Sequence, residues 1–206
     1  ILNGGSQRDD FVFANGATFN GSLNGGAGVD TLDYSAYTSS VTINLLTGTS
    51  TGVSNGVSNM ENLIGGSAND SLTGNDSDNV ITGNGGDDTL VGNGGADTFI
   101  FTAGWGHDLA NGNAGEDTLD FTALSADLTV TLAATGTTTD GTNTLSFLNA
   151  DVFRSGSGND VFTINGSRDI DLYGNGGNDT FYFINNGALT GKIDAGSGHD
   201  VLDYHN

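Results

Sequence analysis

The chain has 206 residues, with 25 Asp and Glu against four Lys and Arg, and a formal net charge of −21. This balance excludes binding to a nucleic-acid backbone, which requires a basic surface. The absence of Cys excludes disulfides and thiol chemistry, and no apolar run approaches the ~20 residues of a membrane span.

A glycine-rich phrase, in which an Asp is followed two residues later by an apolar residue, recurs along the chain. It starts as a degraded copy at 4–12 (GGSQRDDFV) and continues as a regular copy at 25–33 (GGAGVDTLD). An unbroken run follows, with steps of nine residues between Asp70, Asn79, Asp88 and Asp97. Further copies lie at 112–120, 155–163, 174–182 and 195–203. Copies in such register predict one supersecondary unit stacked on itself, with its carboxylates aligned along the stack as metal ligands.

A longer repeat encloses the short one. The phrases at 6–13, 94–101 and 176–183 match one another, and their Asp residues are 88 and 82 positions apart. We therefore divide the chain into a first unit (1–92), a second unit (93–174) and the start of a third (175–206), which can also form one continuous solenoid. Each of the first two units holds a variable insert, at about 35–63 and about 122–153.

The two inserts are predicted to contribute β-strands. The first contains VTINL, and the second contains LTVTL and TLSFL. The alternation of Leu128, Val130 and Leu132 is typical of a strand with one buried face. Asn55-Gly56 and Asp140-Gly141 are dipeptides that favour hairpin turns.

The short phrases resemble the GGxGxDxUx nonapeptide of the RTX (repeats-in-toxin) family. The resemblance implies an all-β fold, a right-handed parallel β-roll or β-helix solenoid with calcium-binding Gly/Asp turns and inserted strands. In this family two nonapeptides form one coil, and each calcium ion lies between successive turns, bound by backbone carbonyls and by an Asp from each turn. Several Ca²⁺ ions are therefore the expected cofactors. The ligands that the resemblance assigns are Asp9, Asp30, Asp70, Asn79, Asp88, Asp97, Asp108, Asp117, Asp160, Asp179 and Asp200.

The same resemblance predicts which ligands share an edge of the coil. Calcium takes about six to eight oxygens, which one turn cannot supply but two adjacent turns can. The pairs expected are Asp70/Asp88, Asn79/Asp97, Asp9/Asp30, Asp97/Asp117, Asp160/Asp179 and Asp179/Asp200. Glycine two residues before the ligand permits a positive φ and a tight turn; it occurs at Gly28, Gly86, Gly95, Gly115, Gly158, Gly177 and Gly198.

Three positions depart from the repeat. Asn79 offers a neutral amide oxygen, so its site is expected to bind calcium more weakly. Ile170 stands where a ligand belongs in the coil 165–173, which predicts a strand without a metal. Asp108 is followed at the core position by Ala110, which places it in a bulge or a loop, with ligand and non-ligand roles equally open.

His107 and His199 could bind zinc and Trp105 could bind a sugar, but solvated histidines and a packed tryptophan are the favoured interpretations. His107 and His199 each precede an Asp at an outward position of the turn, and no HExxH motif or Cys/His cluster accompanies them. Trp105 could stack on a sugar, but packing over a coil edge is the favoured interpretation.

Acidic residues outside the ligand positions do not indicate catalysis. Glu61 and Glu116 lie at unrelated repeat positions, so they do not form a catalytic carboxylate pair. Asp33, Asp120 and Asp203 recur at the ninth repeat position and are expected to satisfy a backbone group or a neighbouring turn.

We therefore expect a calcium-binding structural segment of a secreted or cell-surface bacterial protein, of adhesin, S-layer, filament or matrix type, that folds and rigidifies on calcium and has no catalytic role. Without calcium, self-repulsion and 35 glycines predict a disordered chain. The alternative is an accessory RTX module of a secreted enzyme, such as a metalloprotease, lipase or polysaccharide epimerase. Carbohydrate or ice binding through the Thr-rich stretch 135–144 is less favoured, because this stretch has no regular Thr-x-Thr ladder.

The expected partners follow from the same resemblance. RTX proteins typically leave the cell by type I secretion through a C-terminal signal, which would lie beyond Asn206. Neighbouring repeat units or further copies are expected to stack head to tail on the terminal coils. A surface or polysaccharide ligand fits an adhesin, whereas nucleic acid and a membrane span are not expected.

Overall fold

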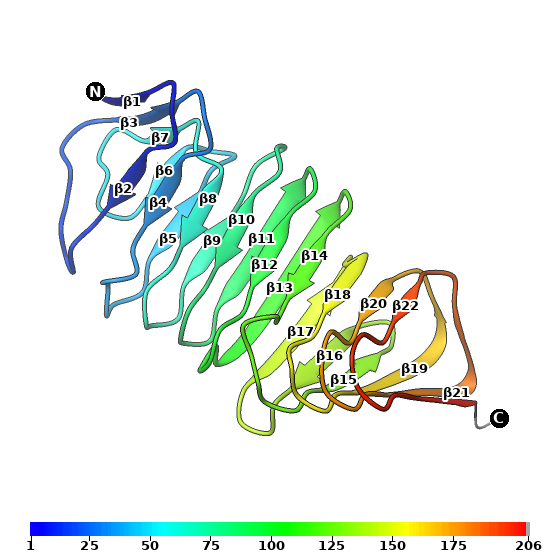
Figure 1. Cartoon of the computed structure of the whole chain (residues 1–206). Coiled ribbons are helices and arrows are strands. Elements are labelled where there is room, and N and C mark those ends of the chain that lie inside the picture. The colour runs from blue at the N-terminus through cyan, green and yellow to red at the C-terminus, as the bar shows by residue number, and fades with distance from the viewer. Residues whose placement is uncertain (205–206) are drawn as a thin grey trace.

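The computed structural model describes residues 1–204, which form an elongated stack of short β-strands with the two ends of the chain at opposite ends of the stack (Figure 1). No helix occurs within these residues. The chain crosses back and forth between two long sheets, so that each pair of crossings makes one coil. The predicted all-β solenoid is therefore confirmed.

The first long sheet has nine strands, and all of its neighbouring strands are parallel. In sheet order they are β2 (Asp10–Val12), β4 (Thr31–Asp33), β8 (Asn62–Ile64), β10 (Val80–Thr82), β12 (Thr98–Ile100), β14 (Thr118–Asp120), β18 (Val152–Arg154), β20 (Asp171–Tyr173) and β22 (Ile193–Asp194).

The second long sheet has eleven strands and includes β5 and β6 of the first insert and all three strands of the second. In sheet order they are β6 (Thr49–Ser50), β5 (Thr42–Asn44), β9 (Ser71–Thr73), β11 (Thr89–Gly94), β13 (His107–Ala114), β17 (Thr144–Leu148), β16 (Gly136–Thr139), β15 (Thr129–Leu132), β19 (Val161–Arg168), β21 (Thr180–Leu189) and β23 (Val201–Tyr204). A small third sheet joins β1 (Leu2–Gly5), β3 (Leu23–Gly26) and β7 (Val57–Ser58).

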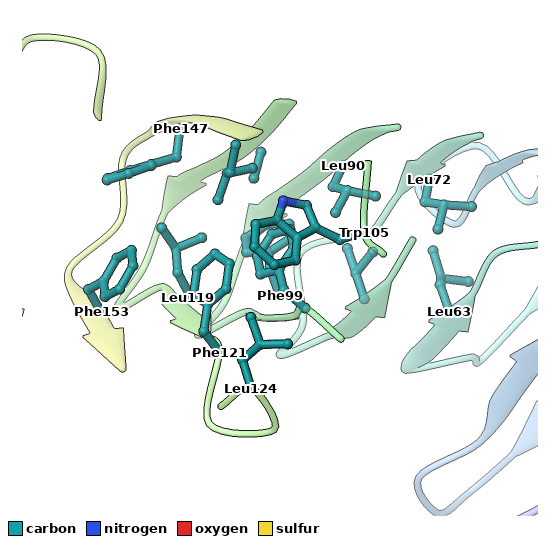
Figure 2. Packing of buried hydrophobic residues seen from close by; sticks show 14 of the residues in the cluster. Leu63, Leu72, Leu90, Phe99, Trp105, Leu119, Phe121, Leu124, Phe147 and Phe153 are labelled. Carbon is teal, nitrogen blue, oxygen red and sulfur yellow. The ribbon is translucent and has the colours of Figure 1, made fainter. Parts of the chain in front are cut away.

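The apolar residue two positions after each Asp points into the space between the long sheets, because side chains alternate along a strand. Leu63, Ile81, Phe99 and Leu119 are aligned on consecutive strands of the nine-stranded sheet, and each is at most 1 % exposed. Figure 2 shows how this apolar row meets the core residues of the other sheet, Leu72 and Leu90 among them. The nonapeptide pattern thus builds one continuous core.

Aromatic rings extend this core within the second unit. The ring of Phe121 lies 4.5 Å from that of Phe101 and 5.1 Å from that of Phe153, stacked on both. Trp105 contacts Phe101 and Phe121 edge to face and is only 1 % exposed (Figure 2). It therefore lies inside the core rather than over a coil edge, and it cannot stack on a sugar.

The inserts do not interrupt the nine-stranded sheet. In the nine-stranded sheet β4 pairs directly with β8, and β14 pairs directly with β18, as if nothing lay between them. The strands of the second insert enter the other sheet instead, where β16 pairs antiparallel with both β15 and β17. The turn at Asp140-Gly141 joins β16 to β17, as the sequence predicts.

Two local expectations are wrong. Asn55-Gly56 does not close a hairpin, because β7 pairs with β3 in parallel; the hairpin of the first insert joins β5 to β6. Gly158 does not have the positive φ found at the other predicted turn glycines. A side chain is excluded there for another reason, since a Cβ would lie 2.3 Å from the carbonyl oxygen of Ala126.

Candidate metal sites

Many of the turns that lead into a strand of the long sheets place an acidic or amide side chain at the edge of the core. Along the nine-stranded sheet these side chains form a first row, made of Asp9, Asp30, Glu61, Asn79, Asp97, Asp117 and Asp151. Along the eleven-stranded sheet there are a second row, made of Asp70, Asp88 and Asp108, and a third row, made of Asp160, Asp179 and Asp200.

After the first member of a row, one oxygen of each carboxylate accepts a hydrogen bond from the backbone N–H of the preceding member. The N–H of Asp70 donates to Asp88 Oδ1 at 2.8 Å, and that of Asp88 donates to Asp108 Oδ1 at 2.8 Å. All six pairs expected from the sequence are joined in this way, at 2.8–2.9 Å: Asp9/Asp30, Asp70/Asp88, Asn79/Asp97, Asp97/Asp117, Asp160/Asp179 and Asp179/Asp200.

The second carboxylate oxygen is buried without a hydrogen-bond partner in most members of the rows. This holds for Oδ2 of Asp9, Asp30, Asp88, Asp97, Asp117, Asp160 and Asp179. A buried polar atom without a partner costs free energy, and a carboxylate oxygen costs more than a neutral one. Repetition of the same unpaired atom along the solenoid therefore fits a series of sites for a positively charged ligand rather than a local defect.

Backbone carbonyls converge on the same space. At Gly92, the position that a Cβ would occupy lies 2.0 Å from Asp97 Oδ2 and 2.9 Å from the carbonyl oxygen of Gly112 in the next coil. At Gly174 the corresponding distances are 2.2 Å to Asp179 Oδ2 and 2.5 Å to the carbonyl oxygen of Ala195. Carboxylate and carbonyl oxygens are the hard ligands that Ca²⁺ prefers. These turns therefore fit calcium.

No cluster of side chains alone accounts for metal binding. Within residues 1–204, no three His, Asp or Glu side chains are grouped so that they could hold an ion. His107 instead places its Nδ1 2.8 Å from Thr144 Oγ1, and its side chain is exposed. A cation at these turns has to be bound by one or two carboxylates together with backbone carbonyls.

Electrostatics also favour a cation at the rows. Burial raises the pKa of Asp88, Asp97 and Asp179 to about 6, and that of Asp108 to about 8. Neighbouring carboxylates raise these pKa values further, whereas the backbone N–H donors lower them. A bound divalent cation supplies the opposite charge that stabilises the ionised forms.

Asn79 differs from the aspartates because its side chain is fully paired within the protein. Its Oδ1 accepts from the N–H of Asn75 at 2.8 Å, and its Nδ2 donates to the carbonyl oxygen of Glu61 at 3.0 Å. Both the oxygen and the nitrogen of this amide group are therefore hydrogen-bonded within the protein, without a metal ion. Asp70 is paired as well, since its two carboxylate oxygens accept from the N–H groups of Val41 and Gly66.

Asp108 is not in a bulge or a loop. It belongs to β13, is 5 % exposed, and takes its place in the second row beside Asp88. Ala110 is 1 % exposed and occupies the core position, so a small residue keeps the register that a larger one keeps elsewhere. Ile170 aligns with Asp151 in the nine-stranded sheet, so the first row of polar side chains ends at Asp151, and the strand predicted for this coil is present as β20.

Two members of the first row, Glu61 and Asp151, were not predicted from the sequence. Glu61 lies at the ligand position of its coil, so the interpretation that it occupies an unrelated repeat position is wrong. Asp151 takes the same position at the end of the second insert. The available signal was an acid followed two residues later by a buried apolar residue, Leu63 or Phe153, without the glycine-rich turn before it.

Two of the three acids at the ninth repeat position, Asp33 and Asp120, satisfy backbone groups, as expected. Asp33 Oδ1 accepts from the N–H of Ser35 at 2.7 Å, and Asp120 Oδ1 accepts from the N–H of Thr122 at 2.9 Å. These carboxylates close the turn after the strand and are separate from the three rows.

Comparison with known proteins agrees with this geometry. The RTX calcium-binding nonapeptide repeat matches the chain in four copies, over residues 64–99, 100–120 and 163–183. No curated protein sequence matches the chain significantly. Nothing in residues 1–204 forms a helix that is long and apolar enough to cross a membrane.

Proposed function

We propose that this chain, which carries RTX calcium-binding nonapeptide repeats, is a structural segment of a secreted or cell-surface bacterial protein of adhesin, S-layer, filament or matrix type, which calcium folds and stiffens. The observation that carries the proposal is the repeated buried Asp Oδ2 atom without a partner. RTX repeats are calcium binders and are typical of secreted bacterial proteins, which supports the extracellular setting.

Calcium would act here as a set of links between coils. Most strands of the nine-stranded sheet are three residues long, so each coil contributes few hydrogen bonds to its neighbours. Ions held between successive turns add contacts at the edges of the solenoid. Because metal binding to the folded chain stabilises it by mass action, calcium concentration would control both folding and stiffness.

We propose further that the segment has no catalytic role. Glu61 is engaged with the backbone of Asp30, and Glu116 is exposed, so the two Glu residues do not face each other across a site. The carboxylates of the rows are committed to neighbouring coils. A mechanical role is the simplest use of a stack whose buried carboxylates lie at the turns between coils.

End-to-end association of copies or of neighbouring repeat units is part of the proposal. The edge strands β2 and β23 leave large apolar side chains uncovered: Val12 is 65 % exposed, Val201 50 % and Leu202 56 %. Open strand edges next to exposed apolar residues are templates for pairing with another chain. Light scattering with calcium and then with chelator is expected to show reversible growth; a monomer at all concentrations would contradict this part.

The main proposal is tested by titrating the chain with calcium after removal of all divalent ions. We expect β-structure in circular dichroism and burial of Trp105 in fluorescence to appear together and cooperatively. Magnesium at the same ionic strength is the control, since it demands about six ligands in strict octahedral geometry and gives up its water reluctantly. Equal folding with magnesium, or no response to calcium, would refute the proposal.

A further inference from the structure

The first row of side chains continues across both inserts, outside the segments that match the nonapeptide repeat. Its members there are Glu61 and Asp151, each at the end of an insert and just before a strand of the nine-stranded sheet. Both lie in the same short turn, an Asn followed two residues later by the acid, which reads Asn59-Met60-Glu61 in one insert and Asn149-Ala150-Asp151 in the other.

The two short turns have the same backbone and the same side-chain clamp. Asn59 has a φ of 50° and Asn149 a φ of 51°, both in the left-handed region. Asn59 Nδ2 donates to Asn24 Oδ1 at 2.7 Å, and Asn149 Nδ2 donates to Asn111 Oδ1 at 2.8 Å. Two inserts with different sequences thus end in the same type of turn, which positions a backbone carbonyl and an acidic side chain.

At the second insert, the Asn149–Asp151 turn reproduces the oxygen arrangement of the regular turns. The position that a Cβ on Gly112 would occupy lies 2.1 Å from Asp117 Oδ2 and 2.2 Å from the carbonyl oxygen of Asn149. Asp151 Oδ2 accepts from the N–H of Asp117 at 2.9 Å. Asp117 is 1 % exposed, and its Oδ2 has no partner. Asn149 thus supplies the carbonyl that a glycine supplies in a regular coil.

The first insert shows the same contacts. A Cβ on Gly25 would lie 2.4 Å from Asp30 Oδ2 and 2.0 Å from the carbonyl oxygen of Asn59. Glu61 Oε2 accepts from the N–H of Asp30 at 2.8 Å. Asp30 is fully buried, with an unpartnered Oδ2. The longer Glu side chain therefore reaches the place that Asp occupies in the regular turns.

On the eleven-stranded sheet the inserts contribute no such acid. Val41 and Leu128 donate their N–H groups to Asp70 Oδ1 at 2.8 Å and to Asp160 Oδ1 at 2.7 Å, but they bring no carboxylate of their own. The inserts therefore extend the ligand pattern on one edge of the solenoid only.

We propose that each insert completes one additional calcium site, between Asp30 and the Asn59–Glu61 turn and between Asp117 and the Asn149–Asp151 turn. This inference rests on the proposed calcium-dependent function. Each site joins a repeat-encoded carboxylate to an insert-encoded carbonyl and acid, so that calcium ties the end of the insert to the preceding coil.

The test counts bound ions. Glu61→Gln and Asp151→Asn keep an acceptor oxygen for the partner N–H but remove the charge, and each is expected to lose one calcium ion by titration calorimetry and native mass spectrometry. Glu116→Gln is the matched control, because its exposed side chain adjoins Asp117 in sequence but is not part of a row; it should retain every ion. An unchanged count in both variants would overturn the inference.

A second measurement needs no substitution. Anomalous diffraction from crystals of the wild-type chain grown with calcium should show peaks between Asp30 and the Asn59 carbonyl, and between Asp117 and the Asn149 carbonyl. Peaks confined to the regular turns would overturn the inference and leave the proposed function standing. A wild-type chain that binds no calcium would instead refute the proposed function itself.

Discussion

Removal of calcium is expected to unfold the chain in a manner that depends on pH. Burial raises the pKa of Asp88, Asp97 and Asp179 to about 6, from a model-compound value of 3.8. A shift of this size corresponds to about 3 kcal/mol for a group fully shielded from water, and solvent screening at the edge of the core reduces that figure. With Asp108, whose pKa is raised to about 8, the four carboxylates together oppose folding by on the order of 5 kcal/mol. That is a large part of the stability of a typical domain, about 5–15 kcal/mol.

The direction of the pH effect follows from these pKa values. Each of the four carboxyls has a higher pKa in the folded than in the unfolded chain, so the folded state holds its proton more tightly. The resulting stabilisation is fully present below about pH 4 and is lost as the pH rises through about 6 for three of them and about 8 for Asp108. In chelator, the chain should therefore be disordered at pH 8 and regain β-structure as the pH falls toward 4.5.

Circular dichroism and Trp105 fluorescence in chelator, measured from pH 8 to pH 4.5, would test this reasoning. The control is the same series in saturating calcium, where the β signal should stay constant between pH 8 and pH 6 because the cation replaces the proton. A full β signal at pH 8 in chelator would show that the buried carboxylates do not oppose folding. Persistent disorder at pH 4.5 would show that their charge is not the cause.

Three substitutions probe other parts of the molecule. Asn79→Asp removes the donor to the Glu61 carbonyl, so it should destabilise the chain by about 1–3 kcal/mol at low calcium and tighten calcium binding in a titration; weaker binding would contradict the assigned position. Phe153→Ala should lower the free energy of unfolding in saturating calcium by about 3–5 kcal/mol, measured with urea, because its ring is fully buried; a loss below about 1 kcal/mol would be inconsistent with that packing. Gly177→Ala should cost more than Gly166→Ala, since both have positive φ but only at Gly177 would a Cβ meet a carbonyl oxygen, at 1.9 Å; equal losses would mean that φ alone matters.

The regular part of the fold could be predicted from the sequence because its rules are local. An Asp, an apolar residue two positions later and a step of nine residues determine which side chains enter the core, and Leu72 and Phe99 are buried accordingly. The same step, doubled, predicts which carboxylates adjoin each other, as in Asp70/Asp88. These features repeat, so each copy supports the assignment of the next.

The remaining features depend on contacts between distant segments. The pairing of β16 between β15 and β17 is a choice among strand partners that no local pattern specifies. Glu61 and Asp151 join the first row through turns too short to match the glycine-rich phrase, so their role became visible only from the hydrogen bonds to Asp30 and Asp117. Asn79 is satisfied by a carbonyl oxygen 18 residues earlier in the chain, which its own repeat could not reveal.

The inserts add strands outside the nine-stranded sheet but none between its strands. This sheet is therefore the constant part of the molecule, and the inserts are the variable part. The nine-stranded sheet passes β4 to β8 and β14 to β18 without a gap, so its length depends only on the number of coils. At a spacing of about 4.8 Å between strands, this spine extends roughly 38 Å whatever the inserts contain. Segments of other lengths or sequences could therefore be exchanged on the opposite side while the distance between attachment points stays fixed. The inserts can therefore change in sequence and length without altering the length of the solenoid that carries them.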